Sequence, residues 1–333
     1  MSAMQGAEER LEEFERVVRS LQSEMARVIV GQKDVVEGVI TCLLAGSHVL
    51  LEGVPGLGKT LLVRTLAQLL ELPFARIQFT PDLMPADILG TTVVTDDERG
   101  GARFEFKKGP IFAPIVLADE VNRATPKTQS ALLEAMQEHR VTLGNVTHDL
   151  GQPYLVLATQ NPLEMEGTYP LPEAQLDRFF FKLRVPFPSH EELLEIMGRT
   201  TGSAEVSLSP VADRELILSL QRTVRDVPVP AHVLDYVARL VRATHADLPL
   251  ASPSVRRFVA TGASPRGAQA LVVAAKIRAL LAGRVAASLE DVKRSALPAL
   301  RHRLLLNFEG EAEGMSTDAV IGELLETLPD GTP

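Results

Sequence analysis

The sequence contains no tryptophan and a single cysteine, Cys42, among its 333 residues. One cysteine excludes an internal disulfide and a metal centre built from several thiolates. Leu43 and Leu44 follow it directly, which favours a buried structural thiol over a reactive one. No run approaches the roughly 18 consecutive apolar residues of a membrane-spanning helix, so we expect no membrane insertion. The glutamate-rich start has the wrong charge for a signal peptide, and these absences together predict a cytoplasmic protein.

Aromatic residues make up only 5% of the chain, whereas apolar and charged residues, at 45% and 23%, are typical of a globular protein. The length predicts two domains, or one large and one small. The net charge of −9 disfavours a general nucleic-acid binder. Residues 253–303 are locally basic and could form a nucleic-acid surface. A solvated helical face, or a contact with an acidic neighbour, is the simpler interpretation, because Phe258 is the only aromatic residue there for base stacking.

Residues 53–60 have the spacing G-x-x-x-x-G-K-[ST] of a loop that holds nucleotide phosphates. Residues 48–51 predict a buried strand leading in, and 59–70 predict the helix leading out, which disfavours an accidental glycine-rich turn. Backbone N–H groups and the positive end of that helix converge on phosphate oxygens. Lys59 adds a cation for the β- and γ-phosphates, and the Thr60 hydroxyl is a Mg²⁺ ligand. The predicted nucleotide-binding residues of this segment are Gly53, Pro55, Gly56, Leu57, Gly58, Lys59, Thr60 and Leu61.

A second apolar run, residues 115–118, ends in the two carboxylates Asp119 and Glu120. The carboxyl ends of strands in α/β sheets open onto the ligand crevice. Asp119 would hold the Mg²⁺ hydration shell beside Thr60, and Glu120 would polarise a water molecule for attack on the γ-phosphate. A solvated acidic turn is the alternative. The position of the pair after a phosphate loop favours the catalytic interpretation.

Three further residues complete the candidate site. Asn161 follows the buried run 154–158, and its amide could hold both a water molecule and a phosphate oxygen. Arg178 precedes a predicted strand and could project into the active site of a neighbouring subunit. Arg266 lies at a predicted helix start in the second domain and could reach the γ-phosphate from there. Either arginine alone would fit a surface salt bridge.

The order of the predicted elements indicates an α/β domain followed by a helical one. Continuous apolar runs fit strands that are buried on both faces of a largely parallel sheet. The expected strands are 48–51, 75–79, 114–118, 154–158 and 179–185. Two β-hairpins are expected as well, 91–94 with 102–106 and 141–143 with 147–150, around the polar turns 95–101 and 144–145.

Helical patterns flank this α/β region on both sides. Residues 8–28 and 35–44 precede the phosphate loop, and no strand pattern is found after Pro188. The later helices are expected at 191–199, 211–225, 231–244, 265–281, 289–296 and 316–328. We therefore expect residues 1–188 to form the N-terminal helices and the nucleotide-binding domain. Residues 189–333 should form an α-helical lid domain with a C-terminal helix.

The motifs together resemble those of AAA+ ATPases. They occur in the order of Walker A, Walker B, sensor 1, arginine finger and sensor 2. The corresponding residues are the phosphate loop, the strand that ends in Asp119-Glu120, Asn161, Arg178 and Arg266. The sequences of these motifs are similar to those of the MoxR family, which belongs to the helix-2-insert group of AAA+ ATPases. The strings that carry this likeness are Val30-Gly31-Gln32, Asp119-Glu120-Val121-Asn122-Arg123-Ala124, Thr159-Gln160-Asn161-Pro162, the run 169–179 (Tyr-Pro-Leu-Pro-Glu-Ala-Gln-Leu-Asp-Arg-Phe) and Gly262-Ala263-Ser264-Pro265-Arg266.

The resemblance implies an AAA+ core with a five-stranded sheet, two β-hairpin inserts and an all-α lid, assembled as a hexameric ring with nucleotide between subunits. It implies ATP and Mg²⁺ as cofactors, and the absence of an Asn-Lys-x-Asp guanine-reading string agrees with ATP. Gly31 and Gln32 would contact the adenine side, although a plain helix stop also explains Gly31. The implied role is chaperone-like, often with a partner that carries a von Willebrand factor A domain, in maturing protein complexes or inserting metals.

Three other functions remain open from the sequence. The motor subunit of a metal chelatase would carry the same residues, and only co-purifying subunits would distinguish it. A nucleic-acid-dependent motor is disfavoured by the acidic total charge. A non-catalytic, nucleotide-gated scaffold is disfavoured because Glu120, Asn161, Arg178 and Arg266 are all present.

Overall fold

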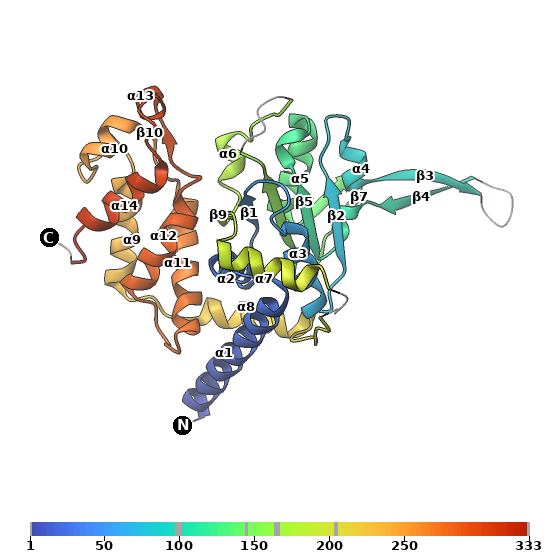
Figure 1. Cartoon of the computed structure of the whole chain (residues 1–333), viewed down its shortest axis with the longest axis horizontal. Helices are drawn as coiled ribbons and strands as arrows, with labels where there is room; N and C mark the ends of the chain where they lie inside the picture. Colours follow the sequence, from blue (N-terminus) through green and yellow to red (C-terminus); the bar gives the residue numbers. More distant parts are fainter. Residues whose placement is uncertain (1, 97–101, 144–145, 163–166, 203–205, 332–333) are drawn as a thin grey trace.

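A parallel five-stranded sheet lies at the centre of the computed structural model, which describes residues 2–96, 102–143, 146–162, 167–202 and 206–331 (Figure 1). The strands lie in the order β2-β5-β8-β1-β9, and every neighbouring pair is parallel. They are β1 (Val49–Glu52), β2 (Phe74–Gln78), β5 (Ile115–Asp119), β8 (Leu155–Gln160) and β9 (Phe181–Arg184). The five apolar runs of the sequence therefore form the predicted sheet.

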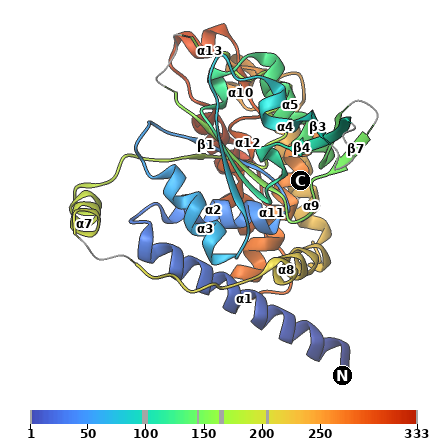
Figure 2. The same ribbon diagram turned by 90° about the vertical axis from the view of Figure 1, so that its right-hand side faces the viewer.

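Two hydrophobic cores cover the two faces of this sheet, because alternate residues of a strand point to opposite sides. In β5, Ile115 and Leu117 enter one core, whereas Val116 and Ala118 enter the other. The first core includes residues of α1 (Ser2–Val28), α2 (Lys33–Leu44), α3 (Lys59–Leu69) and the later helices. The second core includes residues of α4 (Pro85–Leu89) and α5 (Pro126–Glu138). Figure 2 shows α1, α2 and α3 together below the sheet.

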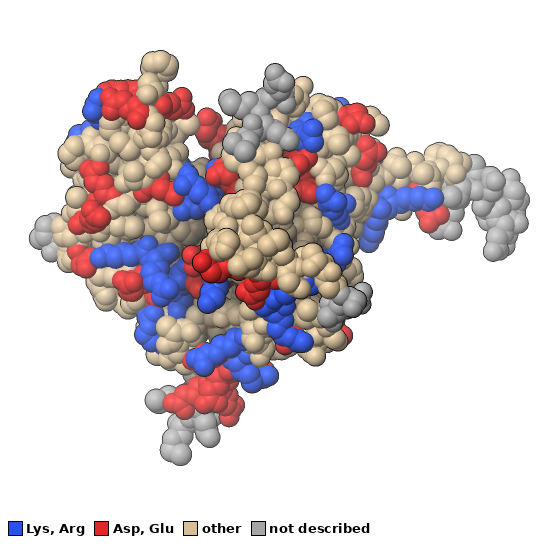
Figure 3. Space-filling model, viewed as in Figure 1, with Lys and Arg blue, Asp and Glu red and all other residues tan. Residues whose placement is uncertain are grey.

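Helix α1 is 27 residues long and amphipathic. Phe14 and Leu21 on its apolar face are fully buried. It packs against α2, α3 and α11. Its acidic beginning projects away from the body of the protein (Figure 3). Within the described ranges no helix has both the length and the apolar character needed to cross a membrane.

The buried His48 connects three elements at the edge where β1 begins. Its Nδ1 accepts a 3.1 Å hydrogen bond from the backbone N–H of Val156, so its Nε2 carries the proton and donates to the carbonyl oxygen of Met136 at 3.0 Å. Burial lowers the pKa of His48 to about 4. The neutral ring therefore ties β1 and β8 to the end of α5.

Two antiparallel hairpins extend from the α/β domain, as predicted. β3 (Gly90–Asp96) pairs with β4 (Ala102–Lys108), and β6 (Arg140–Leu143) pairs with β7 (Val146–Asp149). The first hairpin projects far from the sheet as an arm (Figure 1). Residues 97–101 and 144–145 of the two predicted turns lie outside the described residues.

The C-terminal part is helical, as predicted. Its helices are α7 (His190–Thr200), α8 (Arg214–Asp226), α9 (Ala231–Ala243), α10 (Pro253–Phe258), α11 (Pro265–Leu281), α12 (Leu289–Leu300), α13 (Phe308–Ala312) and α14 (Thr317–Thr327). One short strand pair, β10 (Val259–Thr261) with β11 (Leu305–Leu306), was not expected from the sequence. The remaining short elements are η1 (Pro110–Phe112), η2 (Val121–Arg123) and α6 (Glu173–Leu176).

Most Arg and Lys side chains of the basic segment 253–303 form hydrogen bonds or salt bridges within the protein. Arg303 bonds to Asp177, Arg278 to Glu37, and Arg301 to Asp318. Further intramolecular partners are found for Arg256, Arg257, Lys276, Arg284 and Lys293. These contacts account for the local positive charge as part of the packing of the lid, which agrees with the simpler of the two interpretations made from the sequence.

Candidate active site

The predicted phosphate loop connects β1 to α3, with Pro55 exposed near its middle and Thr60 in the first turn of the helix. Gly56 and Gly58 adopt φ values of 84° and 78°, in the left-handed region where glycine is strongly favoured. No described atom lies within 4 Å of a Cβ built on either glycine. Gly53 differs, because a Cβ there would lie only 3.0 Å from the carbonyl oxygen of Val185. The loop is thus tightly packed where it leaves the sheet and open where it would meet phosphate.

Lys59 folds back across this loop. Its Nζ donates a 2.6 Å hydrogen bond to the carbonyl oxygen of Gly53. Burial lowers the pKa of Lys59, and the negative charges of Asp119 and Glu120 oppose that shift. The ammonium group therefore lies within the field of both predicted catalytic carboxylates.

An apolar cavity of about 300 Å³ adjoins the loop. Its walls include Val30, Leu61, Phe187 and Leu193, and α7 supplies one side. Gln32 lies at its edge, where its Nε2 donates a 3.1 Å hydrogen bond to the carbonyl oxygen of Leu57 in the phosphate loop. Apolar walls beside a phosphate-binding loop suit the base and ribose of a nucleotide.

Gly31 lies against the start of α7, the helix that forms one wall of this cavity. Its φ is 63°, and a Cβ built on it would lie 2.0 Å from Oε1 of Glu192. Glu192 belongs to the capping box of α7, in which its Oε2 accepts a 2.8 Å hydrogen bond from the backbone N–H of Ser189. The positive φ favours glycine at position 31, and the absence of a side chain there lets the Glu192 carboxylate at the start of α7 approach the backbone closely.

Asp119, at the end of β5, is buried, and both of its carboxylate oxygens are engaged. The Thr159 hydroxyl donates to Oδ1 at 2.6 Å. Arg76 on β2 donates to Oδ2 from Nη2 at 2.7 Å and from Nε at 3.2 Å. The contact with Arg76 was not predicted from the sequence.

Glu120 follows in the left-handed conformation, with φ 58°. Its backbone N–H donates to the Thr159 hydroxyl at 2.8 Å. Its Oε2 accepts hydrogen bonds from Gln78 Nε2 at 2.8 Å and from Arg123 Nη1 at 3.0 Å. Gln78, Arg123 and Thr159 were also missed from the sequence. For Gln78 the available signal was the alternation of polar residues on β2, which pairs with β5.

Asn161 lies one residue beyond β8 and is buried. Glu52 pairs with Gln160 in the register of β1 and β8, and the Gly53 N–H donates to the Gln160 carbonyl oxygen at 3.2 Å. The register thus places Asn161 beside the start of the phosphate loop. Phosphate loop, both carboxylates and Asn161 meet at one edge of the sheet, where β1, β5 and β8 end.

The two predicted arginines lie at the opposite edge. The Phe180 N–H donates to the His48 carbonyl oxygen at 2.8 Å, so Arg178 lies where β1 and β9 begin. His48 and Gly53 flank the four residues of β1, and five residue steps along a strand span roughly 16 Å. Arg178 and Arg266 both line one cavity of about 290 Å³. Arg266 therefore lies beside Arg178 at this edge, and the expectation that it reaches the γ-phosphate of its own subunit stays a prediction.

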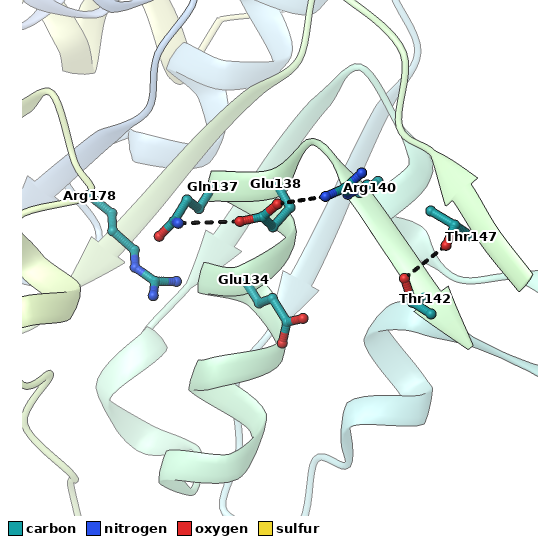
Figure 4. Close-up of a pocket in the computed structure, with 7 residues that line it drawn as sticks. All are labelled: Glu134, Gln137, Glu138, Arg140, Thr142, Thr147 and Arg178. Atoms are coloured by element: carbon teal, nitrogen blue, oxygen red, sulfur yellow. Dashed lines mark hydrogen bonds and ion pairs between the residues drawn. The ribbon is translucent and has the colours of Figure 1, made fainter. Parts of the chain in front are cut away.

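A second, polar cavity of about 460 Å³ opens on the other side of Arg178, between α5 and the β6–β7 hairpin. Figure 4 shows the Arg178 side chain extending toward it, together with Glu134, Gln137 and Glu138 of α5. Arg178 Nε is buried and has no hydrogen-bond partner among the described residues. The Arg178 guanidinium thus lies at this cavity, and its Nε–H remains available to donate a hydrogen bond.

These residues fit ATP and magnesium on chemical grounds. The open glycine loop and Lys59 suit phosphates, and the apolar cavity suits a nucleoside. The Thr60 hydroxyl and the Asp119 carboxylate are the hard oxygen donors that Mg²⁺ prefers. Bound there, the metal would neutralise charge on the β- and γ-phosphates.

Comparisons with known proteins identify the family of the chain. Residues 48–181 match the family described as "ATPase family associated with various cellular activities (AAA)", and residues 254–324 match the AAA lid domain. The chain is 46% identical over 308 residues to chaperone MoxR1 of Mycobacterium tuberculosis, covering 92% of this chain and 80% of that protein. It is 44% identical over 303 residues to the uncharacterised protein YeaC of Bacillus subtilis, covering 91% of each.

More distant and structural relatives agree as well. Protein MoxR of Paracoccus denitrificans is 31% identical over 330 residues, covering 93% of this chain and 95% of that protein. A crystal structure from Cytophaga hutchinsonii, of a protein provisionally assigned as an ATPase, superposes with a TM-score of 0.91 at 41% identity and covers all of both chains. The fold, the order of the motifs and these relatives together show that the chain belongs to the MoxR family of AAA+ ATPases.

Proposed function

We propose that this protein hydrolyses ATP with Mg²⁺ in an oligomeric ring and uses that reaction to remodel or mature partner protein complexes. The observation that carries the proposal is the separation of two half-sites within one subunit. Loop, carboxylates and Asn161 lie at one edge of the sheet, whereas Arg178 and Arg266 lie at the other. Head-to-tail packing around a ring would bring the two halves together.

Each residue has a distinct role in this proposal. The phosphate loop and Lys59 bind the triphosphate, while Thr60 and Asp119 hold the metal. Glu120 accepts the proton of the attacking water molecule, and Asn161 orients that molecule. Arg178 and Arg266 of the neighbouring subunit stabilise the negative charge that develops on the transferred phosphoryl group. Gln32 and the apolar cavity bind the nucleoside, and Gly31 sets the shape of that cavity.

The assembly and its partner are proposed on the family resemblance. We propose a hexamer that acts in the cytoplasm on a protein that carries a von Willebrand factor A domain or on another protein complex. Residues 1–188 would be the nucleotide-binding unit and residues 189–333 the lid. The intramolecular pairing of the basic lid segment supports a protein rather than a nucleic acid as partner.

Two substitutions test the catalytic assignment. Glu120→Gln keeps the shape of the side chain but removes its basicity, so ATP binding should persist while turnover falls by ~10² or more. Lys59→Ala should abolish ATP binding itself. Binding is measured with a fluorescent ATP analogue, and turnover by phosphate release. Wild-type turnover in Glu120→Gln would overturn the assignment of the base.

A further inference from the structure

Four arginine side chains line one cavity of about 390 Å³, where the end of β9 meets α2, α11 and α12. Figure 1 shows α11 and α12 beside β9 and α2. The four are Arg184 of β9, Arg278 of α11, Arg294 of α12 and Arg301, which directly follows α12. Among the described residues, this cavity shares none of its lining with the nucleoside cavity or with the two cavities at Arg178.

Helix α12 and strand β9 bring these arginines together. Arg294 and Arg301 are about two helical turns apart, with Pro298 between them, and all three line the cavity from the same side of the helix. Arg184 lies next to Arg301 because both bind one carboxylate. Arg184 Nη1 donates to Asp318 Oδ2 at 2.8 Å, and Arg301 Nε donates to Asp318 Oδ1 at 3.0 Å.

The positive charge of this cavity is only partly offset. The acidic residues that line it are Asp34 and Glu37, against four arginines. Burial lowers the pKa of Arg301, the charge of Asp318 opposes that shift, and the like charge of Arg184 adds to it. The guanidinium groups therefore repel one another where they are partly removed from water. A bound anion would relieve this repulsion.

Several arginine N–H groups at the cavity remain available as donors. Arg294 is exposed and has no hydrogen bond or ion pair with another described residue. Arg278 uses Nη1 for Glu37 at 2.6 Å and Nε for Ser295 at 2.9 Å, which leaves its Nη2 without a partner among the described residues. Arg301 likewise uses Nε and Nη1 and leaves Nη2. The cavity thus offers charged donors from two helices.

This arrangement favours phosphate over carboxylate as the anion. A phosphate group presents three oxygens around a tetrahedral centre, whereas a carboxylate presents two oxygens in one plane. Donors that approach from different elements match the former. Val35, Leu183 and Leu297 form an apolar part of the wall, which suits the carbon skeleton of an organic molecule. The volume is also in the range of small-molecule sites.

We propose that this cavity binds a small phosphorylated organic molecule, with Arg294 as its principal contact and with Arg278 and Arg301 as further donors. The site lies apart from the residues assigned to ATP, so the inference goes beyond the proposed ATPase function and does not rest on it. A ligand held there would connect β9 with α11 and α12. It should therefore raise the melting temperature of the protein.

The test uses inorganic pyrophosphate, titrated calorimetrically into the full-length protein with Lys59→Ala, which weakens anion binding at the phosphate loop. Pyrophosphate should bind, and adding Arg294→Ala should lower its affinity by about tenfold or more, the scale of losing a hydrogen bond between charged groups. Arg242→Ala is the matched control, because Arg242 is an exposed arginine of α9 outside the lining of this cavity. Its addition should leave the affinity within about twofold.

Two further probes test the chemical class of the ligand. Malonate carries two carboxylates at a similar size and should bind at least about tenfold more weakly than pyrophosphate. Phenyl phosphate should bind more tightly than inorganic phosphate, because its ring can contact the apolar wall. Arg294→Gln is a second neutral variant if Arg294→Ala does not fold, with folding checked by thermal unfolding.

Each outcome decides one part of the inference. Absence of pyrophosphate binding in Lys59→Ala would overturn the site, and so would an unchanged affinity in the folded neutral Arg294 variant. An equal loss in Arg242→Ala would overturn it as well, because general electrostatics would then explain the effect. Malonate binding as tightly as pyrophosphate would overturn the assignment of phosphate.

Discussion

The Ser264 hydroxyl donates a 2.8 Å hydrogen bond to Oδ2 of Asp177, which joins the lid to the residue directly before Arg178. Oδ1 of the same carboxylate accepts a 2.8 Å hydrogen bond from Arg303 Nε. Burial lowers the pKa of Arg303, and the charge of Asp177 opposes that shift. Asp177 thus fixes the start of α11, and with it Arg266, on the same side of the sheet as Arg178.

This geometry predicts a specific pattern of complementation between inactive subunits. Mixing Arg178→Ala with Glu120→Gln should restore part of the ATPase activity, and so should mixing Arg266→Ala with Glu120→Gln. In each mixed ring some sites combine an intact Glu120 with an intact arginine edge from the neighbour. Phosphate release from equimolar mixtures, compared with each variant alone, measures the effect.

The mixture of Arg178→Ala with Arg266→Ala is the decisive control. If both arginines act on the neighbour's nucleotide, every interface lacks one of them and the mixture stays inactive. If Arg266 served its own subunit, the mixture would contain intact sites and would regain activity. Recovery in this mixture would show that the lid moves to the phosphate loop in the working ring.

The arginine placement illustrates what the sequence could and could not predict. Apolar runs identified all five strands, and the polar residues after β5 and β8 indicated the edge that carries the chemistry. The side of the sheet on which the lid packs depends on contacts such as Ser264 with Asp177, which are distant in the sequence. No local pattern encodes them.

The same reason explains the residues that were missed around Glu120. The run at 75–79 was interpreted as a strand buried on both faces, yet β2 is an edge strand in which only Ile77 is fully buried. Arg76 and Gln78 gain their partners from the register between β2 and β5. That register is a property of the assembled sheet.

Gly31→Ala should destabilise the protein and weaken ATP binding. A non-glycine residue in the left-handed region costs about 1–2 kcal/mol. The new methyl group would also displace the Glu192 carboxylate that caps α7. Since α7 forms one wall of the nucleoside cavity, the affinity for the fluorescent ATP analogue should fall together with the melting temperature.

Gly198→Ala is the matched control within α7, where no described atom lies near the added Cβ. Alanine is favoured over glycine inside a helix by about 1 kcal/mol, so this variant should be as stable as the wild type or more so. Equal behaviour of the two variants would contradict the role of the Gly31–Glu192 contact.

The stability of the fold should decrease on acidification because of His48. The unfolded chain takes up a proton there below about pH 6.5, whereas the folded protein resists it down to about pH 4. The stabilisation by the neutral ring is therefore complete above pH 6.5 and is lost as the pH falls toward 4. Protonation of Nδ1 would also break the hydrogen bond from Val156. Burial also lowers the pKa of His302, so this histidine should contribute to the same loss of stability at acidic pH.

Urea unfolding at pH 7 and pH 5 measures this loss. In His48→Gln the decrease in unfolding free energy between the two pH values should be smaller than in the wild type by up to about 2 kcal/mol. His232→Gln, which changes an exposed histidine, should keep the wild-type decrease. Identical pH dependence in all three proteins would show that His48 does not carry the effect.

The β3–β4 arm is predicted to contact the partner protein rather than to support ATP chemistry. Val94 and Phe104 face each other across the two strands and are 61% and 74% exposed. Neither lies among the residues assigned to phosphate, metal or the attacking water molecule. An exposed apolar pair on a projecting arm suits a protein contact.

The double substitution Val94→Ser and Phe104→Ser should leave basal ATPase activity within a few-fold of the wild type while abolishing stimulation by, or maturation of, the partner. Replacing residues 96–101 by a short Gly-Ser turn should have the same effect. Unchanged partner maturation would mean that the arm only covers the edge of the protein, and loss of basal turnover would mean that it helps to build the ring.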